Sequence, residues 1–531
     1  MKPVKLISGF MTVGFWTLAS RVLGFARDIM IASFLGTGAV AEAFLVAFSL
    51  PNMFRRFFAE GAFNTAFVPL FSKKLQKGED PVGFARDAFS GLASLLIVFT
   101  LVAQLVMPWL VLAMASGFRG DVRFDLAVDF GRITFAYILF ISLAALLSGV
   151  LNASGRFAAA AAAPVLLNII LVSALLLGES GAFGSDLEPS NPELSGLSQG
   201  SILAWGTLLA GVAQMALVWL AARRAGFTLL PRRPRLTPDL KRLAIIAAPA
   251  MLAGGVVQIN LLVGRQVASF FDGAIAWLSY ADRLYQLPLG VVGIAVGIVL
   301  LPDLSRRLAA EDEEGSQDAL SRAAEISLAL TIPSAVALIA IPLPLVSVLF
   351  ERGAFGFEDS QATALAVAVY GLGLPAFVMQ KVLQPLYFAR EDTRTPFRFA
   401  VVAMVVNAVV AMVCAYLFGF IGAAFGTTVA GWAMVLLLAT GTKGMGQSAR
   451  FDSRFHARIW RIFLAALVMG AILWALALVL APWLYSATVR YPALALLVVI
   501  GIVSYFAIGQ LVGAFRLTEF KSALRRGSKA P

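Results

Sequence analysis

Seven charged residues lie in residues 20–65, a stretch otherwise apolar enough to enter a membrane. They are Arg21, Arg27, Asp28, Glu42, Arg55, Arg56 and Glu60. A charge at the centre of a bilayer costs on the order of 3 kcal/mol, so seven charges require partners or a ligand. Guanidinium groups match the oxygen geometry of phosphate well. The excess of arginine therefore predicts an anion-binding cavity suited to a diphosphate headgroup.

Helical spacing groups several of these side chains. Arg21 and Asp28 are seven residues apart and therefore share one face of a helix, while Ser20, Gly24 and Arg27 form a neighbouring stripe. Small residues on such a stripe allow another helix to approach closely. We expect the charges beside the stripe to face a space between helices.

A structural role for the same charges is the alternative. The pairs available within one helix are Arg27 or Arg21 with Asp28, Arg56 with Glu60, and Arg283 with Asp282. Such pairs would lock helices together without binding a ligand. Against this interpretation, the charges inside the predicted spans are basic in excess, and the acids inside or at span ends include Asp28, Glu42, Glu60, Asp129 and Asp282. The basic residues are Arg21, Arg27, Arg55, Arg56, Arg132, Arg265, Arg283 and Lys381.

The composition indicates an all-α polytopic membrane protein. Of the 531 residues, 60% are hydrophobic and 14% are charged, which is too little polar surface for a soluble chain of this length. Long apolar runs exclude an outer-membrane barrel. The basic residues do not interleave with aromatic ones, so we expect no nucleic-acid partner.

The sequence argues against an enzyme and against a cofactor. One cysteine, Cys414, and one histidine, His456, cannot make an intrachain disulfide, a Cys/His metal site or a plausible catalytic triad in the bilayer. There is no Walker A loop. We therefore expect no metal and no cofactor, and energy from an ion gradient or the membrane potential.

Fourteen transmembrane helices are predicted from the apolar runs. Their limits are 8–34, 39–71, 87–115, 127–151, 158–178, 200–222, 239–270, 274–304, 319–349, 360–389, 396–418, 420–442, 457–481 and 491–514. The first run has no small-residue cleavage site, which favours an uncleaved span over a signal peptide.

The positive charges predict the orientation. Eight of the 42 Lys and Arg residues fall inside spans. With the N-terminus inside, four more lie in outside loops and the remaining 30 lie on the cytoplasmic side. The four outside residues are Arg119, Arg123, Arg352 and Arg490. This asymmetry predicts that both termini are cytoplasmic.

A weak internal repeat predicts the domain organisation. Residues 31–51 align with 267–288, and 68–72 resemble 301–305. Because both halves begin inside, we expect parallel repeats. The prediction is two six-helix lobes with a central cavity, residues 1–232 and 233–449. Two further helices follow in residues 450–531.

Five motifs carry a resemblance to a known family. They are SRVLGFARD, LPNMFRRFFAEGAFNTAFVPLF, SYADRLYQLP, LFERGAF and YFAREDTRTP. These stretches resemble the MviN/MurJ family of lipid II flippases, part of the multidrug/oligosaccharidyl-lipid/polysaccharide exporter superfamily. The resemblance covers essentially the whole chain and implies the same fourteen-helix, two-lobe architecture.

The resemblance implies that lipid II, an undecaprenyl-diphosphate-linked muropeptide, is moved across the bacterial inner membrane. Its motifs place the headgroup-binding arginines at Arg21, Arg27, Arg55 and Arg283. Supporting charges are expected at Asp28, Glu42, Glu60 and Asp282, although the family often has Asp where this chain has Glu42. The last two helices are expected to form a groove for the lipid tail. Other expected partners are membrane lipids and wall-synthesis proteins, and we expect a monomer.

Two alternatives remain open from the sequence. One is export of another polyprenyl-linked oligosaccharide or of an amphipathic drug, although a drug exporter should favour acids in its cavity. The other is a non-transporting membrane scaffold, in which neutral residues could replace the arginines without loss.

Overall fold

A computed structural model describes residues 3–56, 64–180, 197–229 and 232–514. These residues form helices joined by turns, with an isolated β-bridge between Arg352 and Phe355. The chain divides into two compact units. Unit 1 contains Met1–Ala276 and Arg352–Phe355, and unit 2 contains Trp277–Glu351 and Gly356–Pro531.

Unit 1 is built from the helices before residue 276. They are α1 (Pro3–Leu35), α2 (Ala39–Arg55), α3 (Asn64–Lys77), α4 (Pro81–Leu105), α5 (Met107–Met114), the short η2 (Ser116–Phe118), α6 (Val122–Phe135), α7 (Tyr137–Ala153), α8 (Ala158–Glu179), α9 (Leu197–Arg224) and α10 (Pro238–Ala268). Within this unit α1 packs against α8, α2 against α6, and α9 against both α7 and α8.

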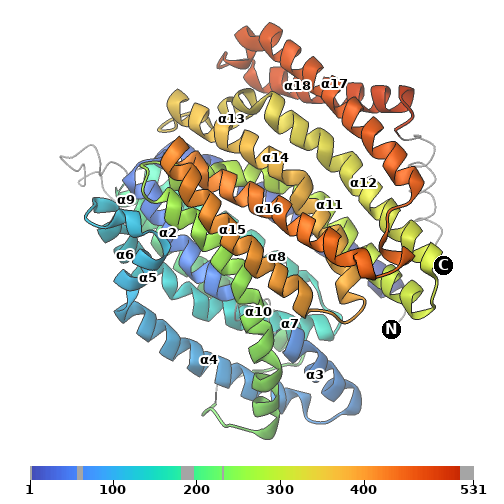
Figure 1. Ribbon diagram of the computed structural model, residues 1–531. Coiled ribbons are helices and arrows are strands. Elements are labelled where there is room, and N and C mark those ends of the chain that lie inside the picture. The colour runs from blue at the N-terminus through green and yellow to red at the C-terminus, as the bar shows by residue number, and fades with distance from the viewer. Residues whose placement is uncertain (1–2, 57–63, 181–196, 230–231, 515–531) are drawn as a thin grey trace. The chain divides into compact units, whose positions relative to one another are not determined.

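Unit 2 begins within the first turn of α11 (Ala274–Ala309). The other helices are α12 (Glu313–Ala340), α13 (Pro342–Phe350), α14 (Phe357–Phe388), α15 (Arg394–Phe418), α16 (Ile421–Gly441), the short η4 (Thr442–Gly444) and η5 (Gln447–Ala449), α17 (Ser453–Leu484) and α18 (Arg490–Leu511). Within unit 2, α15 lies beside α16 and α17 beside α18 (Figure 1).

Local sequence explains several helix starts. Asp80 accepts a hydrogen bond from the Gly83 amide just before Pro81, and Thr237 caps α10 in the same way before Pro238. A side-chain oxygen at the N-cap satisfies an amide that has no helical partner, and proline at the first helical position loses no hydrogen bond. These caps fix where the membrane helices begin.

The helices agree with the predicted spans. In the described residues, each of the fourteen predicted segments coincides with one helix or with two consecutive helices, as 87–115 does with α4 and α5. Residues 57–63 of the predicted segment 39–71 lie outside the described residues. Within the described ranges, ten helical segments are long and apolar enough to cross a membrane. The prediction of an all-α, multi-pass membrane protein is confirmed.

Candidate functional site

Arg27 is buried in unit 1 and bound on two sides. Its Nε and Nη2 donate to Asp28 Oδ1 at 3.0 and 2.6 Å, and its Nη1 donates to Asn168 Oδ1 of α8 at 3.0 Å. The guanidinium also lies 5.6 Å from the centre of the Phe48 ring on α2. Only 5% of Arg27 is exposed. Charge pairing and the aromatic face together offset the cost of burying this cation.

Asn168 connects this ion pair to the neighbouring turn of α1. Its Nδ2 donates to the Ser20 carbonyl at 2.9 Å, and a side chain at Gly24 would begin 3.4 Å from the same nitrogen. The predicted Ser20–Gly24–Arg27 stripe therefore faces α8. Sequence reasoning missed Asn168. The available signal was a polar amide in the middle of the apolar helix α8.

The other charges of residues 20–65 are spread over both helices. Arg21 is exposed on α1, Arg55 is half-buried at the end of α2, and Arg56 is exposed. Glu60 lies outside the described residues, and so does the predicted Arg56–Glu60 pair. The structure therefore brings Arg27 and Asp28 together and leaves Arg55 at the opposite end of α2 from Glu42.

Glu42 belongs to a second buried cluster. Arg123 Nη1 donates to Glu42 Oε2 at 2.9 Å, and 1% of Glu42 is exposed. Arg123 also donates to Asp121 at 2.6 Å and to Asp272 at 2.7 Å, and its guanidinium lies 4.6 Å from the Phe118 ring centre. Arg123, predicted as an outside-loop residue, in fact lies buried in the first turn of α6. It was missed because loop charges are usually solvated.

Glu42 also caps α11. Its Oε1 accepts a hydrogen bond from the Ile275 amide at 2.9 Å. Ile275 is the second residue of α11, where amides have no partner inside the helix. A carboxylate at this position is favoured by the helix dipole as well as by the hydrogen bond. Glu42 thus fixes the start of the helix that carries Asp282 and Arg283.

Asp282 and Arg283 are half-buried on α11 in unit 2. Asp282 accepts a hydrogen bond from Gln286, one turn further along the same helix. The Tyr285 ring beside them lies 5.0 Å from Tyr370 and 5.6 Å from Phe377 of α14. This part of α11 therefore combines charge with an aromatic wall.

An apolar groove lies between α12 and α17 of unit 2. It has a volume of about 480 Å³, and its lining residues are Val336, Ile339, Ala340, Leu467, Gly470, Ala471 and Trp474. The two helices approach closely because position 470 has no side chain, since a Cβ there would lie 2.4 Å from Val336 Cγ1. The groove can accommodate a chain of apolar chemistry.

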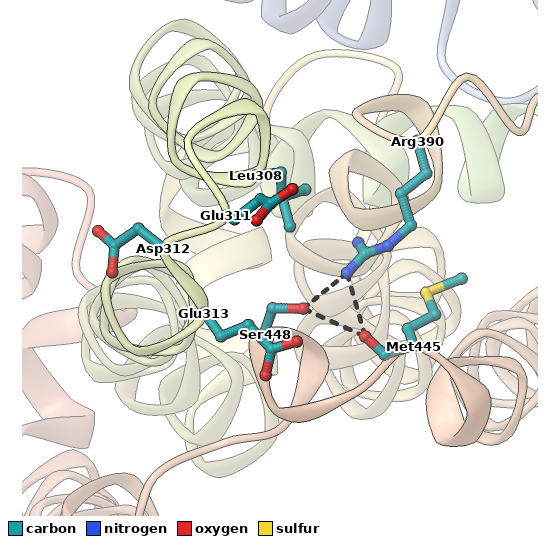
Figure 2. A pocket seen from close by; sticks show the side chains of 7 residues that line it. All are labelled: Leu308, Glu311, Asp312, Glu313, Arg390, Met445 and Ser448. Atoms are coloured by element: carbon teal, nitrogen blue, oxygen red, sulfur yellow. Dashed lines mark hydrogen bonds between the residues drawn. The ribbon is translucent and has the colours of Figure 1, made fainter.

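A polar cavity of about 490 Å³ lies near the ends of α11 and α14. Figure 2 shows Arg390 pointing toward Ser448 and the Met445 carbonyl, with Glu311 and Glu313 on another wall. Arg390 Nη2 donates to Ser448 Oγ at 2.7 Å. Burial lowers the pKa of the Arg390 guanidinium, and the charge of Glu313 partly opposes this effect. Arg390 therefore binds the segment that follows α16, through the Met445 carbonyl and Ser448 Oγ.

A third charge cluster joins α12 to the start of α17. Glu325 is buried and accepts a hydrogen bond from Arg458 at 2.5 Å and another from Arg322. Arg322 also donates to Asp452, which caps α17 through the Phe455 amide at 2.6 Å. This cluster fixes one end of the two helices that line the apolar groove.

Comparisons with known proteins agree with this fold. The family model described as lipid II flippase MurJ matches residues 31–499. A probable lipid II flippase MurJ of Rhizobium meliloti (strain 1021) is 43% identical, covering 99% of this chain and 98% of the relative. A probable lipid II flippase MurJ of Rhizobium tropici is 40% identical, covering 99% of this chain and 98% of the relative.

Solved structures point the same way. One described as lipid II flippase MurJ in an inward closed conformation has a TM-score of 0.77 at 25% identity, covering 94% of this chain and 98% of that one. An inward-facing multidrug resistance MATE transporter of the MOP superfamily has a TM-score of 0.64 at 17% identity, covering 81% of this chain and 95% of that one. At this identity the likeness shows the fold alone. The relatives are named as flippases rather than enzymes. The chain therefore belongs to the MurJ family of lipid II flippases, multi-pass proteins of the bacterial inner membrane.

Proposed function

We propose that the protein flips lipid II from the inner to the outer leaflet of the cytoplasmic membrane, with arginines binding the diphosphate. Membership of a family named for this activity supports the substrate. The observation that carries the proposal is the buried Arg27, held in place by Asp28 and Asn168. A cation fixed inside a membrane protein is a functional candidate because its burial is costly.

Arg27 retains capacity for a ligand. A guanidinium has five N–H donors, and within the described residues hydrogen bonds use three of them. The other two remain available to phosphate oxygens without breaking the pair with Asp28. Asp28 then acts as the residue that orients Arg27, and Asn168 holds it from the other side.

Arg21, Arg55 and Arg283 are proposed to bind the same headgroup. Arg21 is exposed on the helix that carries Arg27, and Arg55 lies half-buried on α2. Arg283 stands beside Asp282, which is the proposed counterpart of Asp28. Glu60 remains a proposed supporting charge, and Glu42 supports the site indirectly by capping α11.

The proposed transport cycle is alternating access. Lobes 1–232 and 233–449 rock around a central cavity while both termini stay cytoplasmic. The excess of Lys and Arg in the segments assigned to the inside supports this orientation. Binding of the headgroup shifts the equilibrium by its difference in affinity for the two states.

The apolar groove is proposed to hold part of the polyprenyl chain. Its lining from α17 belongs to residues 450–531, the region predicted for the lipid tail. The Trp474 ring is exposed at the groove, where an isoprenoid chain would contact it. The ionic cluster at Glu325 supports this role because it fixes the spacing of α12 and α17.

The test is lipid II translocation in vesicles that contain the purified protein, with and without a membrane potential. We expect translocation with the native protein and its loss in Arg27→Ala. The matched control is Arg132→Ala, since Arg132 is also in a predicted span but is exposed and paired with Asp129 at 3.8 Å. Equal translocation by both variants would contradict the assignment of Arg27. No translocation by the native protein would contradict the substrate.

A further inference from the structure

Arg232, in the segment between α9 and α10, is bound to one face of α4 in unit 1. Its Nε donates to Asp87 Oδ1 at 2.7 Å, and Asp87 is only 8% exposed. Its backbone amide donates to Ser90 Oγ at 3.0 Å, and its Nη2 donates to the Gly83 carbonyl at 3.4 Å. Positions 83, 87 and 90 share one face of a helix. These contacts of Arg232, here called the clamp, hold both its side chain and its backbone.

The described residues before the clamp are docked as well. Arg86 Nη2 of α4 donates to the Thr228 carbonyl at 3.2 Å. Leu229 is fully buried, and its carbonyl accepts a hydrogen bond from Trp219 of α9 at 3.3 Å. The chain that leaves α9 is therefore bound to α4 and α9 as far as Leu229, and is not a free linker there.

The residues after the clamp have the opposite character. Residues 233–236 are exposed, and Leu236 reaches 93% exposure. α10 then begins at Pro238. Residues 233–237 span about 18 Å at most when extended, whereas residues 225–237, the whole connection from α9, would span about 45 Å. The clamp therefore shortens the connection to α10 by more than half.

The start of α10 makes weaker contacts with the same part of unit 1. Lys74 Nζ of α3 lies 2.9 Å from Asp239 Oδ2, and half of the Asp239 side chain is exposed. Leu240 packs on α4 at Gly91, where a Cβ would lie 3.0 Å from Leu240 Cδ2. A solvated ion pair contributes little to stability. Opening the clamp, in contrast, would leave Asp87 buried without its counter-charge, which is costly.

We propose that Asp87 is a positioning residue for transport, because its ion pair keeps the clamp closed while the start of α10 moves. This inference rests on the proposed alternating-access function, in which α10 begins the lobe 233–449. As the lobes rock, the weak contacts of α10 open and the clamp stays closed. Residues 233–237 then limit the opening on the side where the predicted orientation places them, the cytoplasm. A longer connection would let the lobes separate further and would slow their return.

The position of an insertion tests this proposal in the full chain. A flexible insertion of about six Gly and Ser residues after Pro234 lengthens the connection beyond the clamp. The same insertion after Gly226 is the matched control, because it lies before the clamp. Gly226 is exposed with φ +93°, and a Cβ there would meet no atom within 4 Å, so added residues are tolerated.

The two insertions should differ in rate and agree in affinity. Doubling a loop disfavours closure by about threefold. Translocation of lipid II in vesicles should therefore fall about threefold or more for the insertion after Pro234 and stay native for the insertion after Gly226. Titration with lipid II should give the native affinity for both variants, since neither change touches the proposed headgroup site.

Substitution of Asp87 provides a second measurement. Asp87→Ala should slow translocation about threefold or more without weakening lipid II binding, and Asp87→Glu should restore part of the rate because it can remake the ion pair. Arg233→Ala, which changes the exposed neighbour of Arg232, is the control and should transport at the native rate.

Two results would overturn the clamp and leave the flippase function intact. One is equal rates for the two insertions, and the other is a native rate for Asp87→Ala. Absence of translocation by the native protein would instead count against the proposed function.

Discussion

The Arg123 guanidinium lies 2.9 Å from the Glu42 carboxylate, although the two residues are 81 positions apart in the sequence. Both side chains are buried, so neither charge has water as an alternative partner. The pair joins α2 to α6 while Glu42 holds the first turn of α11. Glu42 therefore contacts two other helices, α6 through an ion pair and α11 through a hydrogen bond from the backbone.

Removing Arg123 should destabilise the protein strongly. Arg123→Ala leaves Glu42 buried without its counter-charge, which typically costs about 3–5 kcal/mol. Glu42→Gln should cost less, because the amide oxygen still accepts from Ile275. The melting temperature in detergent should therefore be highest for the native protein, lower for Glu42→Gln and lowest for Arg123→Ala. Equal melting temperatures for Arg123→Ala and the native protein would refute the structural role of the pair.

Arg283→Ala should abolish complementation of a flippase-depleted strain while the protein still inserts in the membrane. The reason is loss of a proposed contact with the diphosphate, which a neutral methyl group cannot replace. Arg283→Lys should restore part of the activity, since it keeps the charge but not the planar fork. Membrane abundance of each variant, measured by immunoblot, serves as the control. Full complementation by Arg283→Ala would remove this residue from the site.

Asn168→Ala should weaken binding of lipid II more than it weakens the fold. A hydrogen bond to a charged group contributes about 1.5–3 kcal/mol, so a loss of roughly tenfold or more in affinity is expected. The matched control is Asn152→Ala, because Asn152 is exposed at the end of α7. Titration of the purified variants with lipid II measures the difference. Identical affinities for the two variants would show that Asn168 does not position Arg27.

Filling the apolar groove should slow transport without unfolding the protein. Ala471→Phe places a ring in the space between α12 and α17, where the polyprenyl chain is proposed to lie. Ala475→Phe, one turn along α17 and exposed, is the control. Initial rates of translocation in vesicles should fall for the first variant alone. If both variants transport at the native rate, the groove does not hold the tail.

Much of the fold was predictable because membrane insertion imposes a strong rule on the sequence. Spans must be long, apolar and helical, so the fourteen segments could be read from composition alone. The tight contact of Ser20 and Gly24 with another helix also followed from helical spacing. In both cases the information lies within a single helix.

Contacts between distant segments were not predictable in the same way. Asn168 contacts α1 and Arg123 contacts α2 only because of how the helices pack. No pattern in the sequence around either residue indicates which residue it will contact. Arg123 follows Asp121 at the start of a helix and resembles any solvated loop charge. The motif LFERGAF was visible in the sequence, but the hydrogen bond from its Ala354 amide to the Ser33 carbonyl required coordinates.

The hydrogen bond from the Ile275 amide to Glu42 holds the first turn of α11 in place. Arg283 is eight residues beyond Ile275, about 12 Å along the helix axis. A tilt of about 10° around the capped turn would carry the backbone of Arg283 through about 2 Å. Such a displacement is enough to make or break a hydrogen bond. The cap at Ile275 therefore limits how far the backbone of Arg283 can move along its own helix while that hydrogen bond stays intact.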